Sequence, residues 1–184
     1  SFFYPFTELV TGLLFVISYY SFGFSYDLII ALILVSVFVL VIVSDLSYLL
    51  IPDSFILIPS ILILIITILE SGITIGLRQV VFGLFAFLLM YFVMLLGNKL
   101  FKKESLGGAD IKLMFLVGLT LDPMLSILVI FLASIIALPV SLFLLVKNKE
   151  HVIPYGPFLM LGLLIVFFMK MDIQEIFNAM LTWF

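Results

Sequence analysis

Long uninterrupted runs of apolar residues fill this sequence, and they constrain its fold more than any other feature. One of them, LIIALILVSVFVLVIVS at residues 28–44, contains no charged residue. Helices buried in lipid are built from such runs, because all of their backbone hydrogen bonds are made within the segment. The apolar residues do not alternate with polar ones, which disfavours a transmembrane β-barrel.

The composition supports lipid as the surrounding solvent. Hydrophobic residues make up 66% of the 184 residues and charged residues only 10%, whereas soluble domains are roughly half apolar and roughly a quarter charged. We therefore predict an all-α, polytopic transmembrane helical bundle with about six to seven spans. The apolar runs cover residues 7–22, 28–44, 55–69, 76–97, 111–121, 124–146 and 156–169, followed by a mixed tail at 171–184. No soluble domain or repeat interrupts them, so residues 1–184 are treated as one membrane-embedded domain.

The residue inventory limits the possible chemistry. The chain has no cysteine and one histidine, His151, which argues against disulfides, thiolate metal sites, a cysteine nucleophile and a multi-histidine zinc site. We expect no metal, no cofactor and no nucleic-acid partner. The sequence starts at Ser1 without a methionine or a charged leader, which suggests further residues upstream.

Basic residues predict the orientation. If the runs alternate in direction, one face receives residues 1–5, 45–54, 98–110 and 147–155. That face carries most of the lysines: Lys99, Lys102, Lys103, Lys147 and Lys149, with Lys112 just inside the next run. The opposite face carries Arg78 and Lys170. The positive-inside rule makes the lysine-rich face cytoplasmic.

Two aspartates on the predicted cytoplasmic face differ in what they indicate. Asp45 ends an apolar run, where a carboxylate opposes the helix dipole, so we favour a functional role. Asp53 follows Pro52 and precedes the next run, which is the usual arrangement of a turn and a helix cap. For Asp53 the capping interpretation is preferred.

A third aspartate, Asp110, lies in SLGGADIKLM at residues 105–114. It also precedes a helical run, so capping is one interpretation. Gly107, Gly108 and Ala109 favour another, because small residues permit close backbone approach and unusual dihedral angles, which a cap does not need. Lys112 is two residues further on, off the same helical face, and we expect it to reach the membrane interface rather than pair with Asp110.

Other polar residues have structural interpretations. Glu8, three residues after Pro5, fits a cap at a helix start. Tyr155, Gly156 and Pro157 indicate a turn that opens a helix, although they could also line a cavity. We interpret His151 as a solvated loop residue.

If Asp45 and Asp110 meet, they could form a proton-sharing pair. Two close carboxylates do not both ionise easily, so one keeps its proton. The ionised member could deprotonate a water molecule, and the protonated member could hydrogen-bond a scissile carbonyl and protonate the leaving amine. The spacing alone does not show that they meet. A proton-coupled transporter using the same carboxylates is the alternative from another class, disfavoured because both lie at the ends of runs.

Four segments in order resemble the type IV prepilin peptidases, which are membrane aspartic proteases of the GxGD type. They are YPFTELVTGLLF, DLSYLLIPDSF, GGADIKLM and IPYGPFLMLG, and they extend from Tyr4 to Gly162. The resemblance implies that Asp45 and Asp110 are catalytic. It also implies that the substrates are prepilins or pseudopilins, whose short basic leader is cut off at the cytoplasmic face of the inner membrane, commonly after a glycine.

The chain departs from the family pattern at several points. Ala109 stands where the GxGD motif has its second glycine. The N-terminal transmembrane segment and cytoplasmic loop of bacterial relatives are absent from this sequence, and the resemblance gives no basis for predicting N-methyltransferase activity from it. Another GxGD intramembrane protease remains an alternative, although its Tyr-Asp pair is missing, since Ser44 precedes Asp45.

Overall fold

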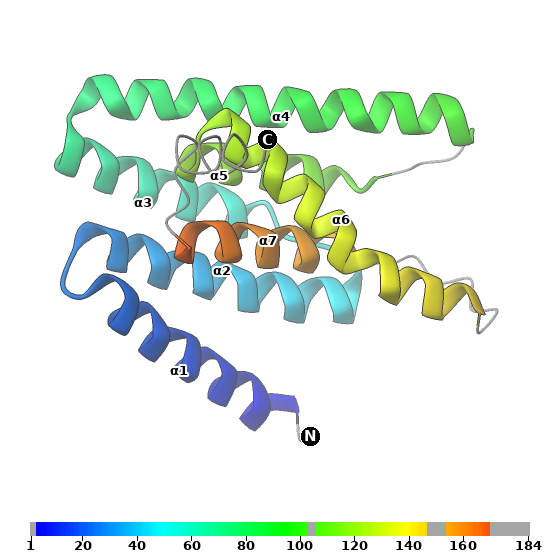
Figure 1. Cartoon of the computed structure of the whole chain (residues 1–184), viewed down its shortest axis with the longest axis horizontal. Coiled ribbons are helices and arrows are strands. Elements are labelled where there is room, and N and C mark those ends of the chain that lie inside the picture. The colour runs from blue at the N-terminus through cyan, green and yellow to red at the C-terminus, as the bar shows by residue number, and fades with distance from the viewer. Residues whose placement is uncertain (1–2, 103–105, 147–153, 170–184) are drawn as a thin grey trace, which may run out of the picture.

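A computed structural model of the protein describes residues 3–102, 106–146 and 154–169, and these ranges form seven helices and no strand (Figure 1). The helices are α1 (Phe3–Phe22), α2 (Tyr26–Tyr48), α3 (Ser54–Ser71), α4 (Ile73–Phe101), α5 (Gly108–Thr120), α6 (Pro123–Val146) and α7 (Gly156–Phe168). The predicted all-α bundle is confirmed. The expectations for His151 and for the tail at 171–184 lie outside the described residues.

Five of the helices are long and apolar enough to cross a membrane. The candidate spans are Pro5–Phe22, Tyr26–Tyr48, Ser54–Ser71, Ile73–Leu100 and Pro123–Phe143. Helices α5 and α7 have 13 residues each, so each is about 20 Å long, shorter than the hydrocarbon layer of about 30 Å. Helix α7 is a shorter apolar helix. The protein is therefore a membrane protein whose long helices accompany two short ones.

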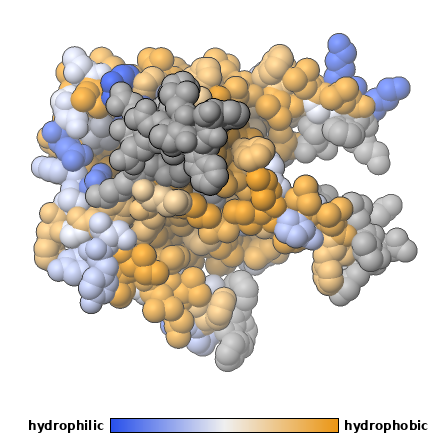
Figure 2. Space-filling view, viewed as in Figure 1, coloured by the Kyte–Doolittle hydropathy of each residue, from blue (hydrophilic) through white to orange (hydrophobic). Residues whose placement is uncertain are grey.

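The outer surface is as apolar as lipid contact requires. Figure 2 shows hydrophobic residues over most of the visible face, and exposed large side chains such as Leu13, Leu57 and Leu88 come from α1, α3 and α4. In water such a surface would aggregate. Serine and threonine hydroxyls within the helices donate to backbone carbonyls one turn earlier, as Ser36 does to Leu32 and Thr67 to Ile63, so they are satisfied without water.

The two short helices lie in the core. Helix α5 packs against α4, and α7 packs against α2 and α6. Fully buried side chains from both short helices, such as Leu113, Met114, Leu159 and Met160, join Leu34 of α2 in one hydrophobic cluster. The N-terminal ends of α5 and α7 are thereby held next to the C-terminal end of α2.

Two glycines let α4 and α5 pack closely. A Cβ on Gly118 would lie 2.4 Å from the backbone oxygen of Phe82, and one on Gly83 would lie 3.0 Å from the ring of Phe115. Only glycine fits at Gly118, where backbone meets backbone. Small residues at such crossings are typical of helix packing in membranes.

The helices alternate in direction, so chain segments distant in sequence meet at one end of the bundle. In Figure 1 the C-terminal end of α2 and the N-terminal ends of α5 and α7 lie at the right, and the ends of α4 and α6 project beyond them. The turns at the opposite end use Gly23 and Gly72, both with positive φ. The candidate site lies at the right-hand end of this view.

Candidate active site

A cavity of about 530 Å³ opens where α2 ends and where α5 and α7 begin. Its lining includes Asp45 and Asp110 from two different helices. It also includes all but one of the residues that the sequence motifs single out around them: Pro52, Asp53, Gly107, Gly108, Ala109 and Lys112. The exception is Glu8. The structure thus brings the two aspartates to one cavity at a single end of the bundle, in line with the sequence-based expectation.

Asp45 lies near the C-terminal end of α2 and is buried, with 7% of its surface exposed. The backbone N–H of Gly156, the first residue of α7, donates a hydrogen bond to its carboxylate. A Cβ on Gly156 would lie 3.1 Å from Asp45 Oδ2 and 2.8 Å from Ile51 Cδ1. Gly156 is therefore fitted to the carboxylate, and α7 holds Asp45 in place.

The loop after α2 is fixed by the residue that precedes Asp45. The buried Ser44 hydroxyl donates to the backbone oxygen of Leu50, and Leu49 ends α2 in the left-handed conformation, with its N–H bonded to the Asp45 carbonyl. This arrangement folds the chain back over the end of α2. Pro52 and Asp53 consequently face the same cavity as Asp45.

Asp110 lies in the first turn of α5, outside the five candidate spans, and is 6% exposed. Burial raises the pKa of its carboxyl from 3.8 to about 7; the charge of Asp45 adds to the rise, and a hydrogen bond from the Gly107 backbone opposes it. That bond resembles half of a capping box, since the third helical residue reaches back to the N-cap N–H. Asp110 therefore both caps α5 and faces the cavity, close enough to Asp45 to be influenced by its charge.

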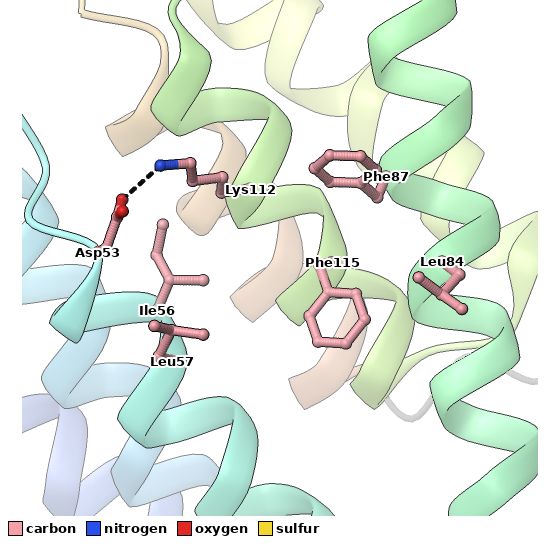
Figure 3. A pocket seen from close by; sticks show the side chains of 7 residues that line it. All are labelled: Asp53, Ile56, Leu57, Leu84, Phe87, Lys112 and Phe115. Carbon is pink, nitrogen blue, oxygen red and sulfur yellow. Dashed lines mark hydrogen bonds and ion pairs between the residues drawn. The ribbon is translucent and has the colours of Figure 1, made fainter.

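Asp53 does not act as predicted. It stands at the N-cap position of α3, but its side chain makes no capping hydrogen bond. Instead Asp53 Oδ1 accepts from Lys112 Nζ at 2.6 Å, and both side chains are about half exposed (Figure 3). The capping interpretation is wrong because a cation from α5 competes successfully for the carboxylate. Lys112 avoids Asp110, as expected, but it pairs with Asp53 rather than extending alone to the interface.

The small residues before Asp110 contribute space rather than unusual dihedral angles. Gly107 has φ −71° and ψ 144°, and the positive-φ glycines of the described residues do not include Gly107 or Gly108. A Cβ on Gly107 would lie 3.2 Å from Asp110 Oδ2, whereas one on Gly108 would meet nothing within 4 Å. Gly107 is thus close to the Asp110 carboxylate of its own turn, and the expected approach of another chain segment stays a prediction. The expectation of unusual dihedral angles is wrong for both glycines.

Glu8 is not a helix cap. Helix α1 begins at Phe3, so Glu8 lies beyond its first turn, with an exposed side chain. The capping expectation is wrong because the helix starts before Pro5, which an N-terminal turn tolerates.

Two site residues were underestimated from the sequence. Tyr155 lines the cavity, and Gly156 contacts Asp45. The Tyr155 hydroxyl is hydrogen-bonded to Ser134 Oγ at 3.1 Å and to the Ile130 carbonyl at 3.3 Å, which ties the start of α7 to α6. Burial raises the pKa of Tyr155, so it stays protonated. The segment IPYGPF did indicate that these residues could line a cavity, but a turn that opens a helix explained them equally well.

The ranges that the structure describes contain no cluster of possible metal ligands. Within them no group of three or more His, Asp or Glu side chains could hold a metal ion. The arrangement that is present, two buried carboxylates facing one cavity, is suited to moving a proton between a water molecule and a bound substrate.

Comparisons with known proteins agree with this arrangement. The family described as the type IV leader peptidase family matches residues 32–142, which include both Asp45 and Asp110. A relative in Myxococcus xanthus (strain DK1622), named prepilin leader peptidase/N-methyltransferase, is 32% identical over 117 residues. That alignment covers 62% of this chain but only 34% of the relative. No solved structure matches the chain.

Proposed function

Because the chain belongs to the type IV leader peptidase family, we propose that it is a membrane aspartic endopeptidase that removes the short basic leader of prepilins or pseudopilins. The observation that carries the proposal is the meeting of Asp45 and Asp110 at one cavity. Both carboxylates are buried, and they reach that cavity from segments far apart in the sequence. The proposal is limited to peptide-bond cleavage.

The two aspartates take different roles in the proposed reaction. With a pKa of about 7, Asp110 holds the shared proton near neutral pH, while Asp45 is the ionised member of the pair. Asp45 removes a proton from a water molecule, whose oxygen attacks the scissile carbonyl carbon. Asp110 hydrogen-bonds the carbonyl oxygen as the tetrahedral intermediate forms. The C–N bond then breaks, and the leaving nitrogen receives a proton from the pair.

The surrounding residues support this division of labour. The Gly156 N–H orients the Asp45 carboxylate, which leaves the other lone pairs of the carboxylate to act on water. Gly108, exposed and with open space at its Cβ position, leaves room for a substrate backbone beside Asp110. The Asp53–Lys112 pair connects the two segments that carry the catalytic aspartates.

The positions of the lysines support a cytoplasmic orientation of the site. Lys99 and Lys102 lie at the C-terminal end of α4, which is the end of the bundle that carries the cavity, and Arg78 lies near the other end of α4. Under the positive-inside rule the cavity faces the cytoplasm. We therefore propose an enzyme of the inner membrane that meets its substrate on the cytoplasmic side.

Cleavage by the purified protein in liposomes tests this function. The substrate is a prepilin-like peptide with a basic leader, a glycine and an apolar membrane helix, and mass spectrometry of the products locates the cut. We expect one cut, just before the apolar helix. Uncut peptide, together with proton-driven solute uptake by the same vesicles, would favour the transporter instead.

A further inference from the structure

An apolar groove lies beside the candidate active site, between α3 and α4, with α5 at its base (Figure 3). Its volume is about 300 Å³. Its apolar lining comes from Ile56, Leu57, Leu84, Phe87 and Phe115. None of these apolar residues takes part in the cleavage reaction proposed above.

The base of the groove is formed by one face of α5. In the middle of this helix, only that face carries side chains that are exposed or half-buried. Lys112 and Phe115 are one turn apart on that face, and the residues between and beside them are buried. The Phe115 ring is packed against Gly83 of α4. Helix α4 therefore forms a fixed wall, held to α5 by the glycine contacts described above.

The rim of the groove is open to the surroundings of the bundle. Leu57 on α3 is 58% exposed and Leu84 on α4 is 50% exposed. Both helices are candidate membrane spans, so the groove opens toward lipid. An apolar helix could enter it sideways from the bilayer without crossing water.

The groove adjoins the active-site cavity. Asp53 and Lys112 line both spaces, so their ion pair stands at the junction. A second apolar groove, between α2 and α3, shares no lining residue with the active-site cavity. Of these two apolar grooves, the one between α3 and α4 therefore lies next to the point where a peptide bond would be cut.

We propose that this groove binds the apolar helix that follows the scissile bond of the substrate, an inference that rests on the proposed peptidase function. A helix rises about 1.5 Å per residue, so the first few turns after the cut must lie within reach of the cavity. The groove offers those turns an apolar surface at the junction with the aspartates. Substrate selection then depends on an apolar segment outside the cut site as well as on the residues around it.

Filling the groove tests the proposal. Leu57→Trp and Leu84→Trp place a large side chain at the rim of the groove. Leu69→Trp and Leu77→Trp are matched controls on the same helices, since both leucines are exposed and neither lines the groove. Each protein is assayed with a helix-bearing prepilin and with a leader peptide that has the same scissile bond but no apolar helix.

The readout is kcat/KM for the helix-bearing prepilin divided by kcat/KM for the peptide without the helix. We expect this ratio to fall about tenfold in the two groove variants, through a higher KM for the helix-bearing substrate, and to stay at the wild-type value in the controls. A ratio that is unchanged in the groove variants, or that falls equally in the controls, would overturn the groove proposal. Cleavage of neither substrate by the wild-type protein would instead contradict the peptidase function.

Crosslinking provides a second measurement that does not depend on turnover. A photoreactive phenylalanine replaces Leu84 in the Asp110→Asn protein, in liposomes that contain the helix-bearing prepilin, and replaces Leu77 as the control. We expect crosslinks from position 84 to the first turns of the apolar helix. Crosslinks to lipid alone would show that the groove holds an acyl chain. Equal crosslinking to the substrate from position 77 would show that the groove does not bind the substrate helix specifically.

Discussion

Gly156 lies against the carboxylate of Asp45, with its N–H donating to the carboxylate and its Cα so close that a Cβ would be 3.1 Å from Oδ2. The contact joins the first residue of α7 to the last turns of α2, which are more than a hundred positions apart in the sequence. It makes the start of α7 part of the candidate active site.

Replacing Gly156 with alanine tests this contact. The added methyl group would press on Asp45 Oδ2 and on the tip of Ile51, and small displacements of a catalytic group can lower rates by about 10²-fold. We expect a fall in kcat of that order with little loss of stability. Gly12→Ala on α1 is the control, because nothing lies within 4 Å of its Cβ position; equal rates in both variants would contradict the prediction.

The ion pair between Asp53 and Lys112 should show energetic coupling. A double-mutant cycle with Asp53→Asn and Lys112→Gln measures the coupling from thermal unfolding. Because both side chains are about half exposed, we expect a modest coupling of about 0.2–1 kcal/mol, smaller at high salt. Strictly additive effects at low salt would mean that the two side chains do not interact in the membrane.

The raised pKa of Asp110 predicts a dependence of stability on pH. The folded protein keeps the Asp110 proton up to about pH 7, whereas the ordinary pKa of 3.8 applies when the chain is unfolded. Between these values the folded state binds more protons at Asp110, so the contribution of Asp110 to stability is greatest below pH 3.8 and falls as pH rises toward 7. Thermal unfolding from pH 4 to 8 should show a decline of roughly 2–4 kcal/mol, which Asp110→Asn removes. The same slope in wild type and variant would contradict the assignment.

Gly118 should tolerate no side chain. A Cβ there would lie 2.4 Å from a backbone oxygen of α4, and backbone does not move aside as a flexible side chain does. We expect Gly118→Ala to destabilise the protein by about 1–3 kcal/mol, as overpacking commonly does. Thermal unfolding measures the loss, and a melting temperature equal to that of Gly12→Ala would show that the two helices are not in contact there.

Much of the fold could be predicted because the apolar runs mark the helices directly. Alternation of the runs also predicted that Asp45 and Asp110 lie at one end of the bundle. The treatment of residues 1–184 as one domain stays a prediction, as does the catalytic role of the two aspartates.

The remaining features depend on contacts that local sequence does not encode. Asp53 looks like a cap because Pro52 and a helical run surround it, and the competing Lys112 is 59 residues away. Gly156 looks like part of a turn, and only the packing of α7 on α2 reveals the carboxylate next to it. In each case a local pattern was read correctly as a helix boundary, but a tertiary contact decided what the side chain or the backbone N–H does.

Whether Asp45 and Asp110 are both catalytic is tested most directly by the initial rate of prepilin cleavage by Asp45→Asn and by Asp110→Asn, each measured separately. Asp27→Asn, at the opposite end of α2 from Asp45, is the matched control, and thermal unfolding verifies that every variant is folded. We expect each of the first two changes to lower the rate by at least about 10³-fold, while the control cleaves the substrate at the wild-type rate. Cleavage at the wild-type rate by a folded Asp45→Asn or Asp110→Asn protein would contradict the catalytic role of that aspartate.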